Sequence, residues 1–166
     1  MIRIRILRNE IVYDIDHDTL FLQKVRINAD DSQMNSHLFS SDADNSYRIG
    51  RWIERYWNRV LGTSSAYLVR GKQVGGGADN AVADWEVRDI VLDMPDGWPE
   101  NRLQELADAV HWYIVYSVEY EFLLLAYGAG DNVVQERQAA AEDALYDIRA
   151  ILSARTHGLK MPFHPF

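Results

Sequence analysis

The chain has 166 residues, of which 48% are hydrophobic and 25% charged, values that fit one globular domain with a sizeable core and exclude a largely disordered polymer. Because it contains no cysteine, disulfides and thiolate metal sites are excluded. The net charge of −8 opposes bulk attraction to nucleic acid, while the predominance of arginine among the basic residues favours fixed, forked contacts at ordered interfaces.

The N-terminal region predicts a β-hairpin over residues 1 to 16. Isoleucine and arginine alternate over residues 2 to 6, and an apolar run resumes over residues 11 to 15. The start lacks the long apolar stretch of a signal peptide, so we expect none. Residues 18 to 27 then predict a short helix, although the same run fits a strand, and the polar residues 28 to 46 predict a solvated loop.

Residues 49 to 61 form the clearest predicted helix, because their apolar side chains recur at the spacing of one helical face. Gly62 fits the end of this helix. Arginines follow one flank of the apolar face, at Arg48, Arg51, Arg55 and Arg59. This stripe can bind phosphates, can pair with carboxylates of the acidic chain, or can form a subunit interface with the neighbouring aromatic side chains.

Two strands are predicted in the middle of the chain, over residues 67 to 69 and residues 85 to 94, where apolar side chains alternate. Residues 72 to 83 lie between them and contain three consecutive glycines. Lys72 precedes these glycines, and no Gly-Lys-Ser/Thr end leads into a helix as in a phosphate-binding loop, so we interpret the segment as a mobile connection.

Residues 98 to 156 predict an antiparallel helical hairpin with a turn at Gly128-Ala129-Gly130 and a helix cap at Asp131. The first arm carries a long apolar stripe from Leu103 to Leu125. A second apolar set lies roughly opposite, at Trp112, Tyr116 and Leu123. A helix that is apolar on two sides is either central in the bundle or shared with another subunit.

Each arm of the predicted hairpin carries a charge within its apolar stripe, Glu121 on the first and Arg137 on the second. Both lie about eight residues from the turn, so an antiparallel hairpin would bring them to the same level. Because an unpaired buried charge is costly, the sequence predicts an ion pair between Glu121 and Arg137 that sets the register of the hairpin.

No pattern of residues identifies a catalytic, cofactor or metal site. The run from Asp14 to Asp18 places carboxylates beside His17, but it lacks the glycine and distal glutamate of a calcium loop, so we interpret it as a strand end and helix cap. The histidines lack metal spacing. Charged residues within the long apolar stretch of residues 110 to 127 argue against a membrane span. We therefore expect a non-enzymatic protein without a cofactor.

The C-terminal segment, residues 157 to 166, cannot be helical through its two prolines. It carries apolar side chains at Met161, Phe163 and Phe166. Because free aromatic rings would be exposed to water, we expect this tail to pack on its own domain or to dock on a neighbouring subunit.

Several elements occur in an order that is similar to small virion proteins of tailed bacteriophages. They are Asp18 to Ile27, Ile49 to Leu61, the strand that ends in Leu92-Asp93-Met94-Pro95, Leu103 to Leu125, and the alanine-rich helix that ends at Leu152-Ser153-Ala154-Arg155. In this order they resemble the head-tail connector and completion proteins of phages of gut bacteria. The resemblance implies a ring of about twelve copies beneath the portal.

The sequence thus predicts one domain over residues 1 to 166, of the α+β class and mainly α. We expect a bundle of about four helices with a small antiparallel sheet or extended β arms. From the resemblance, the partners are further copies of the chain, portal or tail proteins and nearby DNA, in a virion assembled in the host cytoplasm. The alternative is an acidic monomeric or dimeric binding module, of immunity or regulatory type, that holds a basic partner.

Overall fold

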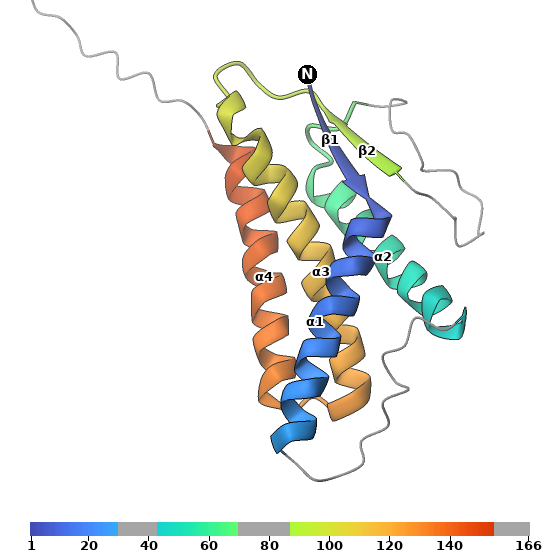
Figure 1. Cartoon of the computed structure of the whole chain (residues 1–166). Helices are drawn as coiled ribbons and strands as arrows, with labels where there is room; N and C mark the ends of the chain where they lie inside the picture. The colour runs from blue at the N-terminus through green and yellow to red at the C-terminus, as the bar shows by residue number, and fades with distance from the viewer. Residues whose placement is uncertain (30–42, 70–86, 155–166) are drawn as a thin grey trace, which may run out of the picture.

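The computed structural model describes residues 1–29, 43–69 and 87–154. Over these ranges the fold is α+β and mainly α, with four α-helices and a two-stranded antiparallel sheet, as predicted (Figure 1). In chain order the elements are β1 (Ile2–Leu7), α1 (Arg8–Ala29), α2 (Ala43–Thr63), β2 (Val87–Leu92), the 3-10 turn η2 (Glu100–Arg102), α3 (Leu103–Tyr127) and α4 (Asn132–Ser153).

The centre of the fold is α3, which packs against α1, α2, α4 and β1 (Figure 1). Its buried side chains point in every direction around the helix, and they are Leu106, Val110, Tyr113, Ile114, Val115, Ser117, Val118, Glu119, Phe122 and Leu123. The apolar surface on both sides of this helix is therefore used largely within one chain, which is the central position that the sequence left open.

The α3–α4 hairpin forms as predicted. Gly128 ends α3 with a φ of 79°, a conformation that an L side chain rarely adopts, and the Asp131 carboxylate caps α4 by accepting a hydrogen bond of 2.9 Å from the Val133 amide. At the other end of α4, the indole of buried Trp98 donates a hydrogen bond of 2.9 Å to the Ile151 carbonyl. The turn before η2 is thereby attached to the last turn of α4.

The sheet pairs β1 with β2 in an antiparallel register that places Ile4 opposite Ile90. The predicted segment 67–69 runs along the other side of β2, where the Val69 amide donates to the Val91 carbonyl at 3.0 Å. Facing outward, Arg5 donates two hydrogen bonds to the buried carboxylate of Asp89, and these bonds lower the pKa of Asp89.

A buried arginine connects the sheet to α2. The guanidinium of Arg88 lies 2.6 Å from a carboxylate oxygen of Glu54 and is stacked over the ring of Trp57. Because the side chain of Arg88 is almost fully buried, this pairing satisfies a charge that would otherwise be costly inside the protein.

The predicted N-terminal hairpin is wrong in its second arm, because residues 11 to 15 belong to α1. Ile11, Ile15 and Thr19 are spaced by four residues and are all buried, whereas Tyr13 is largely exposed. A strand would instead have placed Ile11, Tyr13 and Ile15 on one face. The first arm forms as β1 but pairs with β2, which lies far away in the sequence.

The segment predicted as a loop over residues 28 to 46 is helical at both ends, since α1 ends at Ala29 and α2 begins at Ala43. Gly62 lies within the last turn of α2, which ends one residue later. Residues 72 to 83 and the predicted tail from 157 to 166 lie outside the described residues. Among the helices that the structure does describe, none has an apolar stretch long enough to cross a membrane.

Substitution of Ile148 by alanine tests the packing of α4. Because Ile148 is 0% exposed in the contact between α4 and α3, we expect Ile148→Ala to lower the free energy of unfolding by about 2–5 kcal/mol. The control is Tyr146→Ala on the same helix, where the side chain is 69% exposed and the expected change is below about 0.5 kcal/mol. Urea denaturation of both variants measures the difference, and equal losses would contradict this orientation of α4.

Candidate functional site

The four arginines of the predicted stripe lie together on one flank of α2, and all four side chains are exposed. Arg55 is used within the chain, because it pairs with Glu121, and Arg59 lines a small cavity of about 130 Å³ between α2, α3 and α4. Arg48 and Arg51 form no ion pair with the described residues. They leave an unpaired positive surface on the N-terminal half of α2.

The predicted ion pair between Glu121 and Arg137 is wrong, because each side chain has a different partner. The Glu121 carboxylate accepts hydrogen bonds of 2.8 Å from Arg55 and 2.7 Å from the hydroxyl of Tyr56, both on α2. Burial raises the pKa of Tyr56, so its hydroxyl stays protonated and acts as the donor. Glu121 therefore faces α2 rather than α4.

Arg137 instead bridges two carboxylates from different helices. Its Nε lies 3.1 Å from Oε2 of Glu119 on α3, and its Nη2 lies 3.4 Å from Oδ2 of Asp18 on α1. Glu119 is 0% exposed, and neither of its carboxylate oxygens has a hydrogen-bond partner. This cluster joins α1, α3 and α4, with Glu119 buried and Arg137 and Asp18 partly exposed.

Burial raises the pKa of Glu119 to about 8, because the charged form loses its hydration. Arg137 opposes this shift, while the neighbouring carboxylates of Asp18 and Asp14 add to it. Near neutral pH a substantial fraction of Glu119 is therefore protonated. The charge of this buried carboxyl group beside an arginine thus depends on pH in the physiological range.

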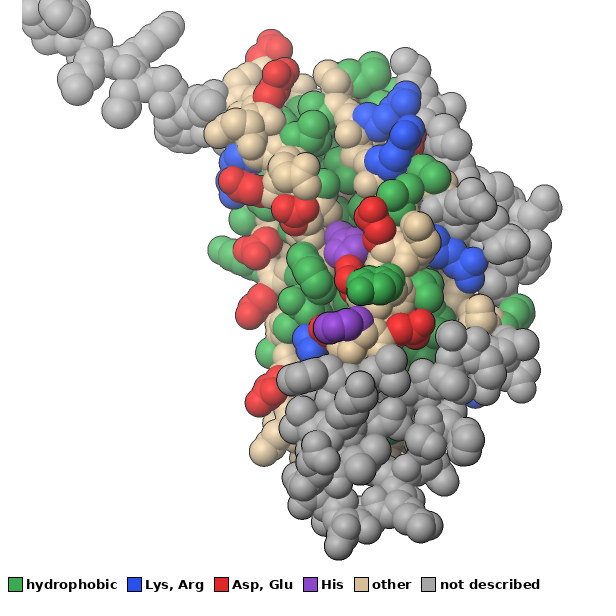
Figure 2. Space-filling view, in the orientation of Figure 1, with side chains coloured by type: hydrophobic (Ala, Val, Ile, Leu, Met, Phe, Trp, Pro, Cys, Tyr) green, Lys and Arg blue, Asp and Glu red, His purple; other side chains and the backbone are tan. Residues whose placement is uncertain are grey.

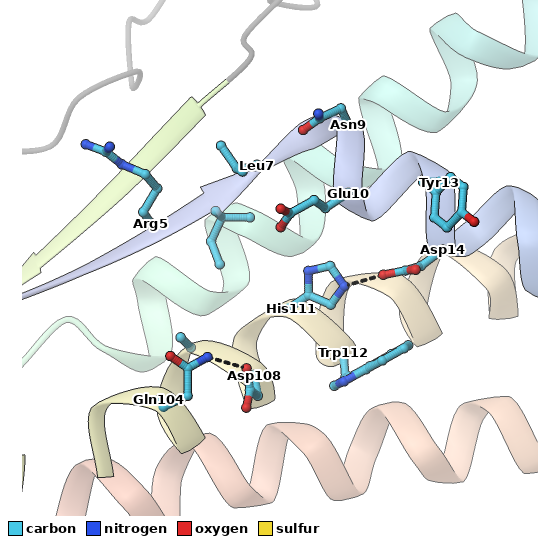
Figure 3. Close-up of a pocket in the computed structure, with 12 residues that line it drawn as sticks. Arg5, Leu7, Asn9, Glu10, Tyr13, Asp14, Gln104, Asp108, His111 and Trp112 are labelled. Atoms are coloured by element: carbon cyan, nitrogen blue, oxygen red, sulfur yellow. Dashed lines mark hydrogen bonds and ion pairs between the residues drawn. The ribbon is translucent and has the colours of Figure 1, made fainter. Parts of the chain in front are cut away.

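Next to this cluster, an open groove of about 670 Å³ lies between the start of α1 and α3 (Figure 3). His111 points from α3 toward α1, where its Nε2 lies 2.7 Å from Oδ2 of Asp14. The interpretation of the run from Asp14 to Asp18 as a strand end and helix cap is wrong, because the run lies within α1. Asp14 pairs with His111, and Asp18 pairs with Arg137. No metal-binding group of three or more acidic or histidine residues is found within the ranges that the structure describes.

A second groove, of about 650 Å³, runs between α3 and α4, and we call it the acidic groove. Carboxylates line it from both helices, at Glu105, Asp108, Asp143 and Asp147, and its walls include Trp112, Tyr116 and the alanines Ala140, Ala144 and Ala150. Acidic side chains are distributed along the edge of the molecule where α4 lies (Figure 2). The groove therefore combines negative charge with aromatic and small apolar surface.

The acidic groove is only partly neutralised by the protein itself. Arg102 pairs with Glu105 at 2.7 Å, and Asp108 accepts a hydrogen bond from Gln104. Asp143 and Asp147 have neither an ion pair nor a hydrogen bond with the part of the chain that the structure covers. Two exposed carboxylates one helical turn apart thus remain available to a cationic partner.

An aromatic stack leads from the acidic groove to the buried cluster. Trp112 is 38% exposed and stacks on Tyr116, with ring centroids 5.4 Å apart and an interplanar angle of 24°. The guanidinium of Arg137 lies over the ring of Tyr116, 5.3 Å from the ring centroid. The aromatic wall of the groove is therefore in contact with Arg137, which lies beside Glu119.

The acidic groove and the arginine stripe lie on opposite sides of the contact between α3 and α4. Ala140 and Ala144 of α4 line the groove, whereas Ala141 and Leu145 line the small cavity that Arg59 also contacts. One molecule therefore presents a negative surface on one side and a positive surface on another.

Among the other residues predicted at an interface, Trp112 and Tyr116 lie in the acidic groove, but Leu123 does not form an exposed surface. Leu123 is 1% exposed and belongs to the core, because α3 is covered on this side as well. Met161, Phe163 and Phe166 lie outside the described residues.

Sequence reasoning missed Glu119, Asp143 and Asp147. Glu119 occurs within a long apolar stretch, which is a signal for a buried charge, but the neighbouring Glu121 carries the same signal. Asp143 and Asp147 have helical i, i+4 spacing, which by itself is typical of any solvated helix face.

Comparisons of this chain with protein-family models, with curated proteins and with solved structures find no match.

The raised pKa of Glu119 predicts a specific pH dependence of stability. In the unfolded chain the carboxyl ionises near its ordinary pKa of 4.5, whereas in the folded protein it ionises near 8. The stabilisation from holding the neutral form is present below pH 4.5 and is lost as the pH rises toward 8.

We therefore expect Glu119→Gln, which cannot ionise, to gain stability relative to the wild type as the pH rises through this window. Denaturant unfolding at a series of pH values measures the difference. Glu136→Gln, which removes an exposed carboxylate from α4, controls for the change in net charge. A difference between Glu119→Gln and wild type that is constant across the window would contradict the raised pKa.

Proposed function

We propose that this protein is a non-enzymatic structural protein of tailed-bacteriophage virions, of the head-tail connector or completion type. In this proposal its copies join head to tail into a ring at the portal vertex, where they contact portal or tail proteins. In this proposal the functional regions of the molecule are the surfaces that contact neighbouring copies and partner proteins.

The order of elements supports this proposal. The aromatic helix α2, the strand β2 and the α3–α4 hairpin occur in the order that led to the resemblance with connector proteins. The strand β1 pairs with β2 inside the same chain, so the small sheet belongs to the subunit itself.

The observation that carries the proposal is the placement of opposite charges on different sides of one molecule. The acidic groove offers Asp143 and Asp147, which have no partner among residues 1–29, 43–69 and 87–154, and α2 offers Arg48 and Arg51 on the other side of the α3–α4 contact. Two complementary surfaces at different places on one chain generate a heterologous contact. Such a contact closes into a ring when the rotation between neighbours is appropriate.

The test is the mass of the protein in solution, measured by light scattering over a wide concentration range and at increasing salt. We expect assembly that weakens with salt, because exposed charges are screened. The double variant Asp143→Asn with Asp147→Asn should raise the apparent dissociation constant by about twofold to thirtyfold, since each exposed ion pair contributes about 0.2–1 kcal/mol.

A matched control removes the same charge outside both the acidic groove and the arginine stripe, in Asp96→Asn with Glu136→Gln, where both side chains are exposed. This control should assemble like the wild type. If the wild type stays monomeric at every concentration, head-to-tail self-assembly is contradicted, and the acidic binding module becomes the better description of the protein.

A further inference from the structure

The acidic groove has the dimensions and chemistry of a binding site for an extended basic segment. Along α4 it extends from Ala140 to Ile151, which corresponds to about 16 Å at 1.5 Å per helical residue. Carboxylates on both rims and an aromatic wall at Trp112 and Tyr116 would receive cationic and aromatic side chains together.

This chain itself contains such a segment. Residues 155 to 166 include Arg155 and Lys160, two histidines and two phenylalanines, and no aspartate or glutamate. In a chain with 25 acidic residues, this composition is the chemical complement of the groove.

Connectivity places the start of this segment at the end of the groove. The helix α4 ends at Ser153, and Ile151, which lines the groove, is only four residues before Arg155. Twelve residues in an extended conformation span at most about 40 Å. This length exceeds the groove by more than 20 Å, which leaves enough chain to pass from one subunit to the next.

We infer that residues 155 to 166 of one copy occupy the acidic groove of a neighbouring copy. The inference rests on the proposed self-assembly and names the contact that makes it. In this contact Lys160 pairs with the adjacent carboxylates of Asp143 and Asp147, and a phenylalanine ring packs against Trp112. The arginine stripe, whose charge also complements the groove, is the competing occupant, and a variant of the tail distinguishes the two.

A complementation experiment with full-length chains tests the inference. The groove variant, Asp143→Asn with Asp147→Asn, keeps an intact tail. The tail variant, Lys160→Ala with Phe163→Ala and Phe166→Ala, keeps an intact groove. At a protein concentration between the dissociation constants of the wild type and the variants, we expect each variant alone to lack the large assemblies that the wild type forms. An equimolar mixture should form a species of twice the monomer mass, because only one functional tail and groove can meet in each pair.

Asp96→Asn with Glu136→Gln again serves as the control and should assemble like the wild type. Circular dichroism verifies that helix content is unchanged in each variant. If the tail variant assembles like the wild type, another surface such as the arginine stripe fills the groove, and the inference is overturned while self-assembly stands.

If both variants are monomeric and their mixture stays monomeric, the tail does not act between copies, which also overturns the inference. A monomeric wild type, in contrast, contradicts the proposed self-assembly itself. The two failures are therefore distinguishable in one set of mass measurements.

Discussion

The structure depends on one constraint, which is that α3 is apolar around most of its circumference and must be covered on every side. No single partner helix can bury such a surface, because a helix contacts its neighbour along one stripe. The fold meets this requirement by placing α1, α2, α4 and β1 around α3. Burial of this one helix therefore gathers parts of the chain that lie far apart in sequence.

The charges on α3 show how this arrangement is oriented. Glu119 and Glu121 are two residues apart, so they point to nearly opposite sides of the helix. Glu119 contacts Arg137 of α4, whereas Glu121 binds Arg55 and Tyr56 of α2. Each carboxylate thus belongs to a different helix contact. If α3 were rotated so that the two carboxylates exchanged positions, each would be buried without its present partner, which is energetically costly.

The spacing of apolar residues in the sequence correctly predicted the elements that bury only one face. The apolar face of α2, the turn and cap of the α3–α4 hairpin and the strand β2 all follow from local spacing and from residues such as Gly128 and Asp131. The phase of α3 could not be predicted in this way. A helix that is buried on all sides has no polar face to indicate its orientation, and so Glu121 was paired with Arg137 in place of Glu119.

The assignment of residues 11 to 15 failed for a related reason, because a short apolar run fits a strand and a helix equally well. Its outcome is decided by the long-range pairing of β1 with β2, which local patterns do not contain. The acidic groove was also hidden in the sequence. Its carboxylates come from two helices, and only the packing of α3 against α4 brings Asp108 near Asp143 and Asp147.

The stack of Trp112, Tyr116 and Arg137 couples occupancy of the acidic groove to protonation of Glu119. It forms a continuous set of contacts from an exposed ring to a guanidinium beside a buried carboxyl group. An occupant of the groove that moves Tyr116 also changes the surroundings of Arg137, and thereby the proton affinity of Glu119. By reciprocity, occupancy of the groove would exchange protons with the solvent, and the acidity of the medium would alter how tightly the groove is filled.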